Sequence, residues 1–176
     1  MIIKLLDFIG ELGPVILFVI TMFLLRFKTN LLVYYCVGML FKVIINALLK
    51  VIIQQPRPIE DPKLFNSMLQ YNRSHRLYYQ IPYDRFGMPS GHSGSVFYST
   101  MFVHLALRDV RTTLFYFVIS LLTLFQRVNN LYHSVPQVIV GSIVGIVVGW
   151  GTFYMATQHK MGSLQRKKDD FAPMFN

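Results

Sequence analysis

Lys50 and Arg57 form the first of three clusters whose residue types could do phosphate chemistry. Six residues separate them, and Arg57 is followed by Pro58. Because Pro56 and Pro58 cannot continue a helix, we expect Lys50 on the last turns of a helix and Arg57 just beyond it. Both cations could then bind one anion. Taken alone, the pair favours the plainer interpretation that two cations extend their charges to lipid headgroups.

The second cluster is Pro89-Ser90-Gly91-His92, which comes directly before an apolar stretch. Ser90 is a favourable N-cap, and Gly91 lets the backbone approach a ligand closely. The free amides and the positive dipole end of the next helix could therefore hold phosphate oxygens, with His92 beside them. The same four residues alone could equally form a turn and a helix cap.

Arg127, His133 and Gln137 make up the third cluster. His133 and Gln137 are four residues apart, so on a helix they would share one face and the amide oxygen could accept a hydrogen bond from the imidazole. That bond would fix the tautomer and present the other ring nitrogen, unprotonated, to an electrophile. In the alternative, Tyr132 and His133 form an interfacial pair that faces lipid headgroups.

Together the clusters supply what phosphoryl transfer requires. The reaction needs cations for the equatorial oxygens, an in-line nucleophile, and an acid that protonates the leaving oxygen. The sequence offers no carboxylate cluster and no Cys/His set with metal-ligand spacing, and Cys36 is its single cysteine. A metal-dependent phosphatase is therefore disfavoured, and no metal or other cofactor is expected.

Five apolar stretches must position these clusters in a chain that is 53% hydrophobic. Only the second and fifth reach the roughly 20 residues that cross a bilayer, so we expect polar ends to extend the other helices. The net charge of +9 comes without a nucleic-acid-binding signature, which points to membrane and phosphate and to no nucleic-acid partner. We predict an all-α polytopic membrane helix bundle with about five transmembrane helices in one domain, residues 1–176. The stretches are residues 12–25, 31–53, 93–107, 112–125 and 138–156.

The long connection over residues 54–88 is expected to be functional. Leu64, Met68 and Tyr71 recur near helical spacing, which indicates either a short helix in the membrane interface or an ordered loop. Five spans place all three clusters on the face of this connection and the C-terminal tail on the other. A modest excess of Lys and Arg puts the tail in the cytoplasm, and so the clusters on the non-cytoplasmic face, such as an endoplasmic reticulum lumen or periplasm-like side.

Two stripes of residues, one polar and one of small residues, are expected to serve helix packing. Lys42 lies within the second stretch, one helical turn from Asn46, and is expected to hydrogen-bond to a neighbouring helix. Gly141, Gly145 and Gly149 should allow a close helix approach, within the bundle rather than in a dimer. The sequence indicates no particular oligomeric state.

The order and spacing of the three clusters resemble the signature of the type 2 phosphatidic acid phosphatase superfamily, which also includes soluble vanadium haloperoxidases. The resemblance covers residues 50–137. It implies that His133 forms a phosphohistidine, and that His92 protonates the leaving group and then activates water. It also implies a set of phosphate-binding residues: Lys50, Arg57, Ser90, Gly91 and Arg127.

The chain departs from this signature at Gln126, where many members have Ser, and at Gln137, where many have Asp. A neutral amide can orient an imidazole, but it stabilises an imidazolium less than a carboxylate does. The string from Tyr132 to Val138 is similar to the dolichyl diphosphate phosphatase branch, which has Gln at that place. That branch usually has Ser where this chain has Gly91.

We therefore expect a metal-independent phosphatase that hydrolyses a polyprenyl diphosphate or a phosphatidic-acid-like lipid, surrounded by membrane lipids. The competing hypothesis is a catalytically weak or silent membrane protein that binds lipid phosphate or serves as a scaffold, and Gln137 keeps it open. Transfer of the phosphate to a sugar or another lipid would use the same residues and differs only in the acceptor.

Overall fold

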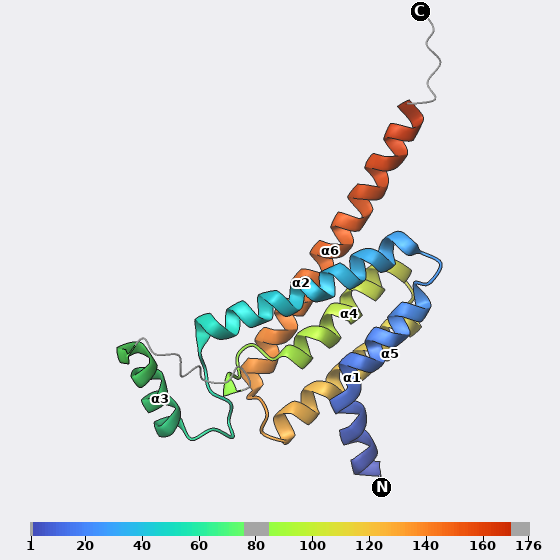
Figure 1. Cartoon of the computed structure of the whole chain (residues 1–176). Helices are drawn as coiled ribbons and strands as arrows, with labels where there is room; N and C mark the ends of the chain where they lie inside the picture. Colours follow the sequence, from blue (N-terminus) through green and yellow to red (C-terminus); the bar gives the residue numbers. More distant parts are fainter. Residues whose placement is uncertain (1, 76–84, 170–176) are drawn as a thin grey trace, which may run out of the picture.

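Every regular element in the described part of the chain is an α-helix (Figure 1), so the expected all-α fold is confirmed. The computed structural model describes the backbone of residues 2–75 and 85–169, and the side chains of residues 4, 6–70 and 85–159. The helices are α1 (Ile2–Leu24), α2 (Thr29–Ile53), α3 (Pro62–His75), α4 (Gly91–Leu107), α5 (Val110–Asn129) and α6 (Val135–Asp169).

The five expected helices form a polytopic membrane bundle, and they differ in how well each suits a lipid surface. Three are long and apolar enough to cross a membrane: Leu6–Leu24 of α1, the whole of α2, and Val135–His159 of α6. Helices α4 and α5 have 17 and 20 residues. Helix α5 extends beyond residues 112–125 at both ends, as expected from its polar flanks. Helix α4 is surrounded by other helices, so it needs less apolar outer surface.

Helix α4 lies at the centre of the bundle and contacts α1, α2, α5 and α6. The rings of Tyr98 and Phe102 pack against Tyr35 of α2, with centroid distances of 5.4 and 5.3 Å. The Tyr35 hydroxyl also lies 2.7 Å from the Ser99 hydroxyl, within a hydrogen bond that joins α2 to α4. Buried hydrogen bonds between helices fix how the neighbouring helices are rotated against each other. The middle of α4 is therefore held in a defined position against α2.

Close packing of α6 on α4 depends on small residues. A Cβ atom at Gly141 would collide with the carbonyl oxygen of Ser90, and one at Gly145 with that of Gly94. At Gly149 the added atom would lie 2.9 Å from the carbonyl oxygen of Tyr98. The prediction that these glycines serve packing within the bundle is confirmed.

Lys42 fastens α2 to the first turns of α4. Its side chain is only 2% exposed, and its ammonium donates to the carbonyl oxygen of Gly91 at 3.0 Å and to the hydroxyl of Ser95 at 2.6 Å. The expected hydrogen bond to a neighbouring helix is confirmed. Because a buried ammonium is costly unless its donors are paired, these bonds make the relative position of α2 and α4 specific.

The long connection contains helix α3, which confirms the expected short helix rather than the loop. The carboxylate of Asp61 accepts hydrogen bonds from two amides in the first turn of α3, those of Lys63 at 2.8 Å and Leu64 at 3.4 Å. Phe65 is 1% exposed and packs against Phe86, with ring centroids 5.9 Å apart. The side chain of Tyr71, part of the pattern that predicts this helix, lies outside the described residues. A position in the membrane interface stays a prediction.

Candidate active site

The residues singled out by sequence come together at one end of the bundle. The end of α2, the start of α4, the end of α5 and the start of α6 all meet there, beside the connection that leads to α3 (Figure 1). His92 interacts electrostatically with Arg127, His133 and Arg57, although these residues are far apart in sequence. The set at this end is Lys50, Arg57, Ser90, Gly91, His92, Arg127, His133 and Gln137.

A tight turn returns the chain from α5 to α6 and places His133 over Arg127. Leu131 adopts a positive φ of 56°, a region that costs a residue with a Cβ atom roughly 1–2 kcal/mol. The His133 amide then donates to the carbonyl oxygen of Arg127 at 3.1 Å. The turn thus brings together the residues expected to act as nucleophile and as a phosphate-binding cation. Backbone strain at such a position is typical of functional sites.

His133 precedes α6, so the expectation that His133 and Gln137 share a helix face is wrong. Ser134 occupies the N-cap position instead, and its carbonyl oxygen accepts from the amide of Val138 at 3.2 Å. The Gln137 amide oxygen in turn accepts from the Ser134 amide at 3.2 Å, as the third helical residue of a capping box does. The helix start, rather than an i, i+4 spacing, aims the Gln137 side chain back at the imidazole.

The imidazole of His133 is oriented through its Nδ1 atom. Nδ1 lies 2.8 Å from the carbonyl oxygen of Gly87 and 3.3 Å from the Gln137 Oε1 atom. A carbonyl oxygen can only accept, so Nδ1 carries the proton in the neutral ring and Nε2 carries the free lone pair. The expected bond to Gln137 is present, but Gly87 supplies the shorter one.

Gln55 supports both of these acceptors, and the sequence gives no indication of its role. Its backbone carbonyl accepts from the Gly87 amide at 2.7 Å, and its Oε1 atom accepts from Gln137 Nε2 at 3.2 Å. Gln137 Nε2 also donates to the carbonyl oxygen of Pro56 at 2.9 Å. Because Nε2 faces two acceptors, Oε1 must face His133. A Cβ atom at Gly87 would lie 2.5 Å from Gln137 Oε1, so a larger residue there would displace the Gln137 side chain.

Two guanidinium groups line the site with donors that no described residue uses. The Nε atoms of Arg57 and Arg127 are buried and have no hydrogen-bond partner among the described side chains and backbone. Buried polar groups normally have a partner, so such donors indicate where an anion would bind. The Arg127 guanidinium also lies 4.9 Å from the centre of the Tyr132 ring and donates to His92 Nε2. Tyr132 therefore stacks on a site residue and is 37% exposed, whereas His133, its partner in the alternative of an interfacial pair, is buried.

The first turn of α4 has the expected cap. The Ser90 hydroxyl accepts from the amide of Ser93 at 3.4 Å and from its hydroxyl at 3.0 Å. The Ser90 amide is taken by the carbonyl oxygen of Gln137 at 3.1 Å, so this amide is not one of the helix donors left for a ligand. A Cβ atom at Gly91 would touch only the amide nitrogen of Asn46, at 3.4 Å. The direct phosphate contacts expected of Ser90 and Gly91 stay predictions.

Burial and nearby cations keep His133 neutral. The side chain is 4% exposed, and the loss of solvent lowers its pKa to about 4, with further lowering by the charges of Arg57 and Lys50. The hydrogen bonds to Gly87 and Gln137 oppose this shift. The Nε2 lone pair is therefore available over the whole physiological pH range. Lys50 is itself only 3% exposed, which strengthens its effect on the ring.

The fold and site define a class of protein: a membrane helix bundle with two histidines and several cations gathered at one end. Among the described residues, no three His, Cys, Asp or Glu side chains lie together in a way that could hold a metal ion. The chain matches the PAP2 superfamily over residues 31–161, and it belongs to that family. The resemblance found in the three sequence clusters is thus confirmed.

Two curated relatives make the similarity more specific. The chain is 29% identical to dolichyldiphosphatase 1 of Plecturocebus moloch and 27% identical to dolichyldiphosphatase 1 of Rhinolophus ferrumequinum. Each alignment covers 81% of this chain and 61% of the relative, so the chain spans less than two thirds of the relatives' length. No solved structure matches the chain.

Proposed function

We propose that this protein is an integral membrane phosphatase that hydrolyses phosphate from a lipid phosphate or diphosphate through a phosphohistidine at His133. The orientation of His133 carries the proposal. Its Nδ1–H is held by Gly87 and Gln137, which leaves the Nε2 lone pair free in a buried, cationic surrounding. A neutral, oriented imidazole beside unused guanidinium donors suits attack on phosphorus.

In the first half-reaction, Nε2 of His133 attacks phosphorus in line with the leaving oxygen. The phosphorus–oxygen bond to the lipid, or to its remaining phosphate, breaks as the phosphorus–nitrogen bond forms. His92 gives a proton to the leaving oxygen. In the structure His92 Nε2 accepts from Arg127, so we propose that a bound phosphate draws this guanidinium onto its own oxygens and that the anion allows His92 to hold a second proton.

In the second half-reaction, water replaces the lipid. His92, now neutral, takes a proton from a water molecule as that water attacks the phosphorus. The phosphorus–nitrogen bond breaks, inorganic phosphate leaves, and the electron pair returns to Nε2 of His133. Lys50, Arg57 and Arg127 neutralise the charge on the equatorial oxygens in both steps, with Ser90 and Gly91 at the helix start as further contacts. No step requires a metal ion.

A polyprenyl diphosphate is the substrate that we propose first, with a phosphatidic-acid-like lipid second. The support is the similarity to two proteins named dolichyldiphosphatase 1, together with Gln137 at the place where that branch has Gln. We further propose that residues 1–176 form a single domain and that the site faces the non-cytoplasmic side, with the C-terminal tail in the cytoplasm. A reporter fused to Asn176 whose signal depends on the compartment tests this orientation.

One observation favours the second candidate, a weak or silent lipid-phosphate-binding protein. Both acceptors of the His133 Nδ1–H, Gly87 and Gln137, are neutral. A carboxylate in that place would stabilise the imidazolium that develops as phosphorus is attacked. The two hypotheses share the cations and differ in whether turnover occurs, so phosphate release separates them.

The decisive experiment measures inorganic phosphate released by the detergent-purified chain in the presence of a chelator. A polyprenyl diphosphate and phosphatidic acid are offered in parallel, without any added acceptor. The phosphatase hypothesis predicts chelator-resistant release from the wild type and none above background from His133→Ala. His104→Ala is the matched control, because His104 bonds to Thr113 at the other end of the bundle.

Three other outcomes would each be informative. Equal background release from wild type and His133→Ala would support the silent binding protein. Release that stops in chelator would contradict metal independence. Release that requires an added sugar or lipid acceptor would instead indicate a phosphotransferase.

A further inference from the structure

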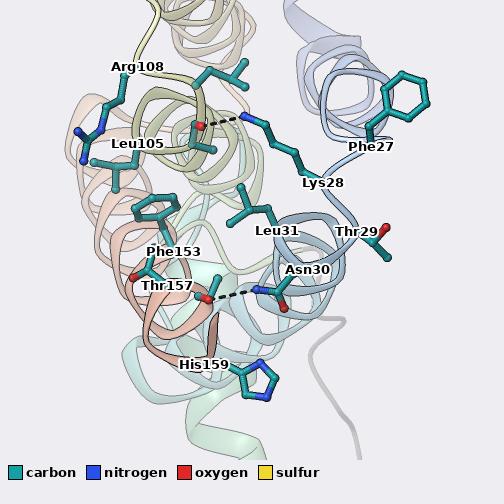
Figure 2. Close-up of a pocket in the computed structure, with 13 residues that line it drawn as sticks. Phe27, Lys28, Thr29, Asn30, Leu31, Leu105, Arg108, Phe153, Thr157 and His159 are labelled. Atoms are coloured by element: carbon teal, nitrogen blue, oxygen red, sulfur yellow. Dashed lines mark hydrogen bonds between the residues drawn. The ribbon is translucent and has the colours of Figure 1, made fainter. Parts of the chain in front are cut away.

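A cavity lies at the end of the bundle opposite the candidate active site (Figure 2). It encloses about 730 Å³ where α1 and α4 end, where α2 and α5 begin, and where α6 passes them. This volume is in the range of small-molecule sites. None of the residues proposed for catalysis lines it. The lining residues are Phe27, Lys28, Thr29, Asn30, Leu31, Leu105, Ala106, Leu107, Arg108, Phe153, Ala156, Thr157 and His159.

The charged residues that line this cavity are both basic. Lys28 and Arg108 come from different connections. No Asp or Glu is among the lining residues. The nearest acidic residue in sequence, Asp109, accepts hydrogen bonds from the amide and hydroxyl of Thr112 at 2.8 and 2.6 Å, so its carboxylate is engaged in capping α5. The cavity is therefore complementary to an anion.

Lys28 and Arg108 are both available to bind such an anion. The Lys28 ammonium makes one long contact, 3.5 Å to the carbonyl oxygen of Ala106. The Arg108 side chain is exposed, and no hydrogen bond or ion pair joins it to another described residue. In Figure 2 the end of α4 lies between Lys28 and Arg108, with the side chain of Leu31 beside Lys28 and that of Leu105 beside Arg108. A ligand that reached both cations would thus also meet an apolar surface.

The remaining walls suit a ligand with a polar head and an apolar body. Leu31, Leu105 and Phe153 supply apolar surface, while the Asn30 amide is fixed by its bond to the carbonyl oxygen of Ala156 at 3.2 Å. The Thr29 hydroxyl adds a polar group beside Lys28. The cavity lies where several apolar helices end, which is the level of the lipid headgroups for a chain that crosses a bilayer.

We propose that this cavity binds the headgroup and upper chain of an anionic glycerophospholipid from the leaflet opposite the active site. Lys28 and Arg108 hold the phosphate and the headgroup acid, and the apolar walls hold the first methylene groups. The site is separate from the catalytic residues, so the proposal does not depend on the chain being an enzyme. A water-soluble phosphate would share the charge contacts but not the apolar ones, and the experiment distinguishes the two.

The test measures which lipids the purified full-length chain retains. The protein is exchanged into mixed micelles with phosphatidylserine or phosphatidylcholine of matched acyl chains, and bound lipid is counted by native mass spectrometry. The shift of the unfolding temperature is recorded in parallel. We expect preferential retention of phosphatidylserine. The double variant Lys28→Gln/Arg108→Gln should retain it roughly thirtyfold more weakly, because the two basic residues contribute about equal factors to the affinity for the headgroup.

Arg111→Gln is the matched control, because Arg111 is an exposed cation at the same end but does not line the cavity. The proposal predicts that Arg111→Gln retains phosphatidylserine as the wild type does. It is overturned if phosphatidylserine has no preference over phosphatidylcholine, or if Arg111→Gln and Arg108→Gln weaken retention equally. It is also overturned if inorganic phosphate or glycerophosphoserine displaces the lipid and raises the unfolding temperature as much as phosphatidylserine does, since the ligand would then be a free phosphate.

Discussion

The two ends of this bundle both gather cations, but they hold them in different ways. We call the end with the candidate active site the catalytic end. There Lys50 is 3% and Arg127 is 8% exposed, and their charges act on His133 and His92, respectively. At the opposite end, Lys28 and Arg108 are exposed and make little contact with other residues. The first end surrounds its cations with helices, whereas the second leaves them at a cavity lined by apolar residues.

This difference indicates different tasks. Buried cations act strongly on neighbouring groups because little solvent screens them. Burial is the main cause that lowers the pKa of His133 to about 4, and the charges of Arg57 and Lys50 lower it further. Exposed cations act weakly on the protein and are suited to attract a ligand. We therefore expect charge at the first end to prepare a reactive group and charge at the second end to select a lipid. The following experiments test that contrast.

Removal of a single arginine should separate the ends most clearly. Arg57→Gln or Arg127→Gln removes a donor to the developing charge on phosphorus, so we expect phosphate release to fall about 10²- to 10³-fold. Arg108→Gln removes the same charge from the other end and should leave the rate unchanged. Steady-state phosphate release from the three variants measures this, and a comparable loss in Arg108→Gln would refute the division.

The next effect concerns two glycines of the catalytic end. Gly87→Ala places a Cβ atom 2.5 Å from Gln137 Oε1, which displaces the acceptor that orients His133. We expect a loss of about a hundredfold in kcat, the size caused by a small misplacement of a reacting group. Gly91→Ala meets only the Asn46 amide at 3.4 Å and should therefore lose less activity than Gly87→Ala. Equal activity of both variants would show that the Gln137 acceptor does not position the imidazole.

The depressed pKa of His133 predicts how stability changes with pH. The unfolded chain binds a proton at His133 near pH 6.5, whereas the folded chain does so only near pH 4, so stability is lost as pH falls through this window. Between pH 7 and 5 the wild type should lose about 2 kcal/mol more than His133→Asn. The free energy of unfolding in mixed micelles at both pH values measures the difference. An identical pH response of the two proteins would mean that His133 is readily protonated in the fold.

The smallest expected effect is that of Gln55, which we propose as a positioning residue. Gln55→Ala removes one acceptor for Gln137 Nε2, while Pro56 keeps the other, so kcat should fall about fivefold with KM unchanged. Gln55→Glu keeps an acceptor and should restore most of the rate. A change in KM alone, or no rescue by Glu, would assign Gln55 a different role.

Much of the catalytic end could be predicted from the sequence because its clusters are short and local. The prolines after Lys50, the cap at Ser90 and the spacing of Arg127 from His133 each indicate a local structure with a chemical consequence. The helix of the long connection was one of two alternatives that its short apolar pattern left open, and only the structure decides between them.

The partners of His133 could not be predicted in the same way. Its nearest acceptor, Gly87, lies 46 residues away, and Gln55 lies 82 residues from the amide it supports. Such contacts depend on how α2, α4 and α6 pack, which periodicity does not specify. The cavity at Lys28 and Arg108 has the same origin, because two connections and parts of α2, α4 and α6 create it only when they assemble.

Covalent phosphorylation of His133 is the step on which the proposed mechanism depends, and rapid acid and alkaline quenching with a radiolabelled lipid phosphate would detect it. His92→Asn should slow attack by water and let the intermediate accumulate. We expect protein-bound phosphate that survives alkali, is lost in acid, maps to His133 and is absent from His133→Ala. Label that persists in His133→Ala, or turnover without any trapped label in His92→Asn, would contradict this mechanism.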